Sequence, residues 1–140
     1  MSATGLEVFD TTLQKTNTWL KDLMEVTGGD RHKAYEALRA VLHALRDRLT
    51  VEEAADFGAQ LPMLIRGIYY EGWDPTGKPV KERHREQFLA RIQQHFKGDG
   101  DVNPEVIAHA VFSLLARRIT GGEIEDVKHI LPLEIRDLWP

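Results

Sequence analysis

The chain contains no cysteine, and this absence excludes several kinds of chemistry at once. Disulfides, thiolate metal sites and cysteine nucleophiles all need the missing thiol. A chain without disulfides suits a reducing compartment, so we expect a cytoplasmic protein. The segment 1–10 lacks the basic and apolar regions of a signal peptide. No stretch approaches the roughly eighteen consecutive apolar residues of a transmembrane helix, so we expect no membrane association.

An excess of positive charge is also missing. The formal net charge is -4, whereas nucleic-acid binding requires a clustered cationic face, so we expect no nucleic-acid partner. The sequence contains no glycine-rich nucleotide loop, no nucleophile elbow and no zinc-protease motif. These absences favour a protein that is not an enzyme without excluding one. We assign no catalytic residue, no metal ligand and no cofactor.

What the chain does contain is a copy of part of itself. Residues 40–69 align without a gap on residues 110–139, and eleven of the thirty positions are identical. The identical pairs include Arg48/Arg118, Thr50/Thr120, Glu53/Glu123, Asp56/Asp126, Pro62/Pro132 and Arg66/Arg136. Residues present in both copies are expected to serve the fold, and residues present in one copy are better candidates for function.

Apolar residues recur at helical spacing, and no sustained alternation indicates a strand. We therefore predict one all-α domain of two pseudo-symmetric three-helix units, with six helices or more if prolines split them. The units span about 9–70 and 80–139, and a linker rich in proline and glycine covers about 70–79. The helices are expected to begin near residues 10, 31, 50, 80, 104 and 122, with a loop at 98–100.

Two local motifs define the third helix of each unit. Thr50 and Glu53 form a capping box, repeated as Thr120 and Glu123, in which each side chain would bind the backbone N–H of the other residue. A proline follows inside each helix, at positions 62 and 132, and predicts a kink or break there. Gly58 is expected to ease the first bend.

The segments 37–49, 59–75 and 77–79 carry an unusual combination of residues, above all the run from Gln60 to Pro75. In these segments the chain resembles an uncharacterised bacterial family, domain of unknown function 2267. The resemblance extends from Phe9 to Trp139. It implies a small all-helical protein of the bacterial cytoplasm, loosely linked to stress responses, and it implies no activity, substrate or catalytic residue.

Three groups of polar residues are candidates for a functional site, and each has a structural alternative. Arg66, four residues after its proline, would either cap carbonyls freed at the break or contribute to a two-fold symmetric anion site. Tyr69, Tyr70 and Trp73 would either close the seam between the units or form a binding surface. We favour burial of Trp73 as an anchor for the linker.

His84 is expected on the apolar side of the fourth helix, either bound to a backbone group or acting as a general base. The pairs Glu105/His109 and Glu125/His129 have the spacing of helix metal sites. They face away from the apolar stripes, so solvated ion pairs are the simpler interpretation.

We expect a non-catalytic helical interaction module, a stress-associated adaptor or a self-associating protein, with another protein or a second copy as partner. Phe112 and Leu133 are expected to be exposed contact residues. The alternative is a small-molecule or anion-binding protein, an enzyme included, with a site between the repeat units. The candidate binding residues are Arg66, Tyr69, Tyr70, Trp73 and His84.

Overall fold

The computed structural model describes residues 3–97, 100 and 102–140, and their regular secondary structure is entirely helical, which confirms the all-α prediction. The helices are α1 (Glu7–Met24), α2 (Arg31–Arg48), α3 (Val51–Ala59), α4 (Met63–Tyr70), α5 (Arg85–Gln93), the 3-10 turn η1 (Gln94–Phe96), α6 (Pro104–Arg118), α7 (Gly121–Ile130) and α8 (Leu133–Arg136). Most of the loop predicted at 98–100 lies outside the described residues. In the described part of the chain, no helix combines the length and apolar character that a membrane crossing requires.

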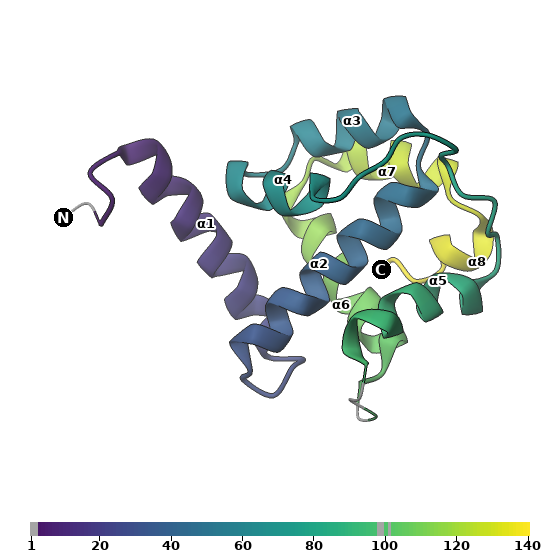
Figure 1. Ribbon diagram of the computed structural model, residues 1–140, viewed down its shortest axis with the longest axis horizontal. Helices are drawn as coiled ribbons and strands as arrows, with labels where there is room; N and C mark the ends of the chain where they lie inside the picture. The colour runs from purple at the N-terminus through teal and green to yellow at the C-terminus, as the bar shows by residue number, and fades with distance from the viewer. Residues whose placement is uncertain (1–2, 98–99, 101) are drawn as a thin grey trace.

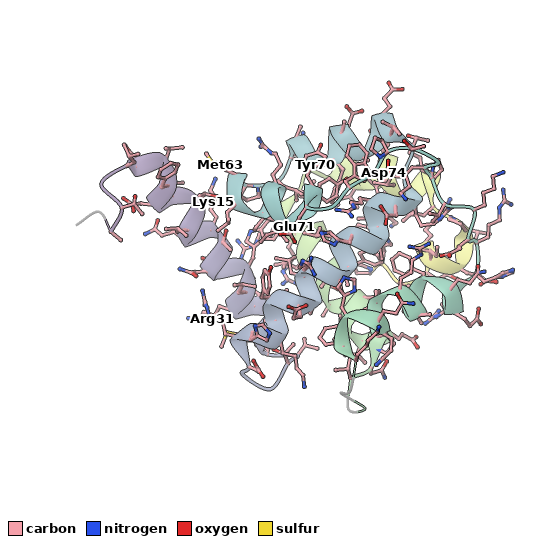
Figure 2. The ribbon with its side chains drawn as sticks, in the orientation of Figure 1. Lys15, Arg31, Met63, Tyr70, Glu71 and Asp74 are labelled. Carbon is pink, nitrogen blue, oxygen red and sulfur yellow. The ribbon has the colours of Figure 1, made fainter. Side chains whose placement is uncertain are left out.

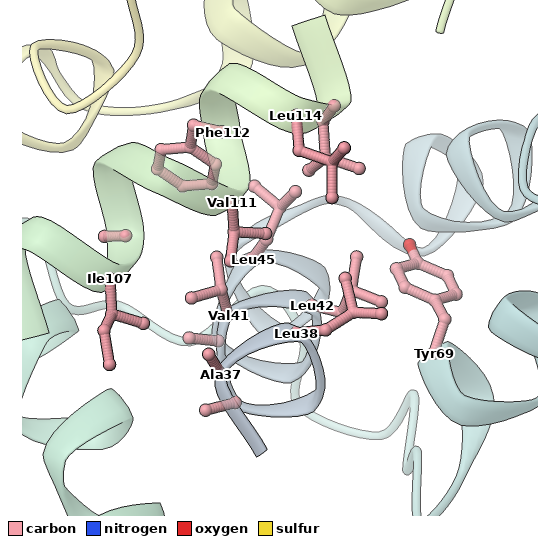
Figure 3. Packing of buried hydrophobic residues seen from close by; sticks show 14 of the residues in the cluster. Ala37, Leu38, Val41, Leu42, Leu45, Tyr69, Ile107, Val111, Phe112 and Leu114 are labelled. Atoms are coloured by element: carbon pink, nitrogen blue, oxygen red, sulfur yellow. The ribbon is translucent and has the colours of Figure 1, made fainter. Parts of the chain in front are cut away.

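Helix α2 lies at the centre of the fold. Eleven of its eighteen residues are buried, and these include the polar side chains of His43, Arg46 and Arg48. Helices α1, α4, α5 and α6 all contact it. Figure 3 shows Val41 and Leu45 of α2 near Val111 of α6, while Tyr69 of α4 approaches from the other side. The buried cluster takes residues from both copies of the repeat.

Helix α1 is arranged differently from the others. Its C-terminal half packs on the body of the molecule, and its N-terminal end projects beyond the body, although Thr12 still lies against α4 (Figure 1). The helical spacing of Leu13, Thr16, Leu20 and Leu23 predicts one buried stripe. The last three are buried, but Leu13 is 38% exposed. The helix also begins at Glu7, three residues earlier than predicted, so it is long enough to extend beyond the core.

Both prolines interrupt their helices, as predicted. Pro62 has φ −57° and ψ 152°, and Pro132 has φ −57° and ψ 151°, so each holds an extended conformation between two helices. Helix α3 therefore ends at Ala59 before α4 begins, and α7 ends at Ile130 before α8 begins. The chain breaks rather than bends because proline cannot supply the helical hydrogen bond and excludes the carbonyl four residues earlier.

The structure corrects two predictions about the second half of the chain. The helix expected from residue 80 begins at Arg85, because the preceding residues run along the end of α2, where the Val80 N–H donates to the Asp47 carbonyl at 2.8 Å. Phe112 was expected at the surface and is fully buried, since the C-terminal segment returns over α6 and stacks Trp139 on it at 4.2 Å. Leu133 is 68% exposed, as predicted.

Candidate functional site

Arg66 caps the end of the helix that Pro62 interrupts. Its guanidinium donates to the carbonyls of Gly58 (3.0 Å), Ala59 (3.3 Å) and Leu61 (2.8 Å). Arg136 makes the same contacts seventy positions later, with the carbonyls of Lys128 (2.8 Å), His129 (3.4 Å) and Leu131 (3.1 Å). A cation at the C-terminal end of a helix also complements the helix dipole. The repeated arginines therefore have the structural role that was one of the two interpretations.

The aromatic residues form a continuous stack that leads from the core to the linker. Tyr69 is fully buried and donates its hydroxyl to the Ala54 carbonyl at 2.7 Å, and burial raises the pKa of its phenol above the usual range. Its ring lies 4.9 Å from that of Tyr70, which lies 5.4 Å from that of Trp73. Trp73 is half-buried against the core, a weaker anchor than predicted, and its indole nitrogen is buried without a hydrogen-bond partner.

Gly58 permits this stack to approach α3. A Cβ placed on Gly58 would lie 2.4 Å from the Tyr70 hydroxyl oxygen and 2.8 Å from its Cζ. No atom can be accommodated at those distances without movement of the ring or the helix. The glycine is therefore required by the close packing of Tyr70, in addition to any effect on the bend at Pro62.

His84 is exposed, which contradicts the expected place on the apolar side of a helix. It precedes α5 because that helix begins at Arg85. Its Nδ1 lies 3.5 Å from Glu134 Oε1, and Glu86 completes a group of three ligand atoms within 4.8 Å of one another. The Arg85 N–H already donates to Glu134 at 2.8 Å. The partial positive charge at the N-terminal end of α5 disfavours the binding of a cation to these three residues.

The two predicted Glu/His pairs are not joined through their side chains. His109 Nδ1 lies 3.0 Å from the Leu138 carbonyl oxygen, and His129 Nδ1 lies 2.7 Å from that of Glu125. Each of these ring nitrogens donates to a backbone carbonyl, so both histidines have local structural roles.

Glu53 of α3 and Glu123 of α7 face each other where the two helices meet. Their carboxyl groups approach each other, and Oε1 of each is buried without a hydrogen-bond partner. Two carboxyls in this arrangement can hydrogen bond to each other only when one carries a proton. Burial, the bond to Glu123 and the charges of Asp56 and Asp126 raise the pKa of Glu53 to about 8. Glu53 therefore holds a proton at neutral pH, which it can donate to the Glu123 carboxylate.

This pairing replaces half of the predicted capping box. Thr50 Oγ1 accepts from the Glu53 N–H at 3.1 Å, as predicted, but the Glu53 carboxyl turns to Glu123 instead of returning to the start of the helix. Thr120 makes no side-chain cap. The repeat placed both glutamates at equivalent positions, and the contact between α3 and α7 brings them together.

Two open grooves lie beside the exposed half of α1. They have volumes of about 560 and 570 Å³, one on each side of Met63, and Met63 and Lys15 mark this region in Figure 2. The second groove is almost wholly apolar, and α4 contributes Leu64, Gly67 and Ile68 to it. A Cβ built on Gly67 would meet no atom within 4 Å, so the groove is open there.

Six large apolar side chains are exposed around these grooves. Their exposed fractions are 53% for Leu6, 53% for Val8, 45% for Phe9, 38% for Leu13, 46% for Met63 and 39% for Leu64. Five of them line one or both grooves, and Leu6 directly precedes α1. Exposed apolar side chains gathered around grooves mark binding sites in soluble proteins more often than isolated ones do. We refer to these six residues as the α1–α4 surface.

The sequence contained a signal for this surface, of which the predicted stripe included Leu13 but not Leu6 or Phe9. Leu6, Phe9 and Leu13 continue the buried positions 16, 20 and 23 at alternating spacings of three and four residues. The full pattern spans the helix, whereas the predicted helix began only at residue 10. None of the five predicted binding residues belongs to this surface. Arg66, Tyr69, Tyr70 and Trp73 lie on or directly after α4, and no contact among the described residues joins them to His84.

The model of one protein family, described as an uncharacterized conserved protein (DUF2267), matches residues 16–138. The match contains α2 to α8 and the buried half of α1, and it begins after the exposed half. Comparison with curated proteins gives no significant match.

Proposed function

The chain belongs to this uncharacterised conserved family, and on that premise we propose that it is a non-catalytic helical interaction module that docks a helical partner on its α1–α4 surface. The observation that carries the proposal is the exposed apolar half of α1 beside the open groove of α4. Because the family match begins at residue 16, the proposal concerns this chain and not the family as a whole. The same proposal includes that the protein is bacterial and cytoplasmic, and that it acts as an adaptor or associates with itself.

The stability of α1 supports this role. Thr4 binds the Asp10 carboxylate through both its N–H (3.1 Å) and its hydroxyl (2.9 Å), which fixes the turn before the helix. On the inner face, the Leu64 N–H donates to Thr12 Oγ1 at 2.8 Å and joins α4 to α1. The helix thus presents its outer apolar side chains from a defined position, and preorganisation of this kind lowers the entropy cost of binding.

The alternative, a small-molecule or anion site between the repeat units, has less support. Arg66 and Arg136, which are equivalent in the two copies of the repeat, both bind backbone carbonyls. His84 makes its contacts apart from the aromatic residues of the linker. A small apolar molecule in the groove of about 570 Å³ is the form of this alternative that fits the observed cavities, since its volume is in the range of ligand pockets.

Photo-crosslinking in cells tests the proposed function. A photoreactive amino acid replaces Leu13, and in a matched control it replaces Leu133, which is exposed on the distant α8. We expect position 13 to give a discrete adduct with one protein identified by mass spectrometry and position 133 to give none. If neither position gives a protein adduct, or if both give the same mixture, the proposal is wrong.

A further inference from the structure

We propose that the partner of the α1–α4 surface is a second copy of this chain, whose α1 lies antiparallel to the first and in its α4 groove. This inference rests on the proposed function and specifies its partner. Such a contact is isologous, because the same surface of each copy contributes both a helix and a groove.

The first argument is the continuity of the apolar stripe. Positions 16, 20 and 23 of α1 are buried in the chain's own core, whereas Leu6, Phe9 and Leu13 continue the same seam and are exposed. Alternating spacings of three and four residues are the pattern by which one helix packs along another. The chain supplies a partner for the second half of this seam and leaves the first half for another helix.

The second argument is the match between this stripe and the groove. An amphipathic helix docks in an apolar groove through side chains spaced by three, four and seven residues. Leu6, Phe9 and Leu13 have the spacing i, i+3 and i+7, and the groove beside them has apolar walls with an open position at Gly67. Each copy therefore carries both the ligand and the receptor of a helix-in-groove contact.

The third argument is orientation. An antiparallel pair centred at the level of Thr11 places Phe9 of each copy opposite Leu13 of the other, so the two apolar stripes overlap. The dipoles of the two α1 helices then oppose each other, which favours the antiparallel arrangement over a parallel one.

The fourth argument is area. Six apolar side chains that are about half exposed present on the order of 500 Å² per copy, given the areas that large apolar side chains bury. A symmetric contact counts this area twice and buries at most on the order of 1,000 Å² of it, before any polar rim is included. That value reaches the lower limit for specific protein interfaces and suits a reversible dimer.

Sedimentation equilibrium of the purified chain tests the proposal, over concentrations from about 1 to 100 µM, where interfaces of this size dissociate. We expect a monomer–dimer equilibrium. Leu13→Glu should raise the dissociation constant at least ~30-fold, the effect of losing one central contact. Gly67→Gln, which fills the groove and leaves α1 unchanged, should weaken the dimer in the same direction. Leu133→Glu is the matched control and should leave the equilibrium unchanged.

Disulfide trapping tests the orientation, since the described chain has no cysteine of its own. A mixture of Phe9→Cys and Leu13→Cys proteins should form a mixed disulfide faster than either protein alone, because only the antiparallel pair brings these positions within disulfide distance. Faster crosslinking of Leu13→Cys with itself would overturn the antiparallel arrangement.

If the chain stays monomeric over the whole concentration range, the proposal that a second copy is the partner is wrong. That result leaves the proposed function intact if photo-crosslinking at position 13 still captures one identified protein other than the chain itself. Circular dichroism and urea unfolding establish that each variant is folded, which we expect because all the substituted side chains are exposed.

Discussion

The shared proton between Glu53 and Glu123 predicts an unusual dependence of stability on pH. A carboxyl whose pKa is higher in the folded than in the unfolded chain binds more protons when folded, so its stabilising contribution is complete at acid pH. With a pKa raised from the ordinary 4.5 to about 8, that contribution is lost progressively as the pH rises between these values. Stability should therefore fall toward alkaline pH, opposite to the behaviour of carboxylates in ion pairs.

The magnitude follows from linkage. A difference of one proton changes the free energy of unfolding by about 1.4 kcal/mol per pH unit, which gives about 2 kcal/mol between pH 6.5 and 8. Because both glutamates are only half-buried, solvent screening reduces the expected change to about 1 kcal/mol. Urea unfolding at half-unit intervals from pH 6.5 to 9 measures it through the midpoint at constant slope.

Glu53→Gln should remove this dependence, because the amide donates to the Glu123 carboxylate without a titrating proton. Glu123→Gln should have the same effect, since the pair holds one proton between its two members. Both variants should be more stable than the native chain at pH 8.5 and nearly equal to it at pH 6.5. Glu52→Gln, an exposed neighbour with the same change of charge, is the control. A pH profile of Glu53→Gln that parallels the native one would refute the shared proton.

Three further variants test other contacts in the fold. Burial lowers the pKa of His43, whose Nε2 donates to the Ile68 carbonyl at 2.7 Å. The stability that the neutral imidazole contributes above about pH 6.5 should therefore be lost as the pH falls below that value. In His43→Gln, the urea midpoint should depend less on pH over that acid range. Arg66→Lys should lower the free energy of unfolding by about 1–2 kcal/mol, because one ammonium group cannot reach all three carbonyls that the guanidinium binds. The control Arg83→Lys, at an exposed position, should leave the free energy of unfolding unchanged. Gly58→Ala should cost about 1–3 kcal/mol despite the better helix propensity of alanine. Most of this cost should disappear when Tyr70→Ala is present, and a remainder should persist because the Tyr69 ring lies 3.0 Å from the same Cβ position; a double-mutant cycle measures the coupling.

The helical class and the breaks at Pro62 and Pro132 could be predicted because they depend on local sequence. Helical periodicity and the missing N–H of proline act within a few residues. The carbonyl-capping role of Arg66 was among the predicted alternatives for the same reason. Its partners lie five to eight residues earlier in the chain.

Features that depend on long-range contacts were not predictable in the same way. Local sequence explained Glu53 fully as part of a capping box. Its carboxyl points to Glu123 instead because α3 contacts α7, which local sequence does not show. Phe112 lay off the main stripe of its helix, and its burial requires the C-terminal segment to return over α6. The exposed half of α1 follows an apolar pattern that looks like core, so sequence alone could not show that the chain leaves it uncovered.

Amide hydrogen exchange along α1 tests the central claim most directly. Exchange is compared at about 1 and 100 µM protein, on either side of the expected dissociation constant of a small interface. The account predicts that amides of residues 7–13 exchange more slowly at the higher concentration, while those of residues 16–24, already packed on the core, do not change. Equal exchange of residues 7–13 at both concentrations would contradict docking of a second copy on the α1–α4 surface.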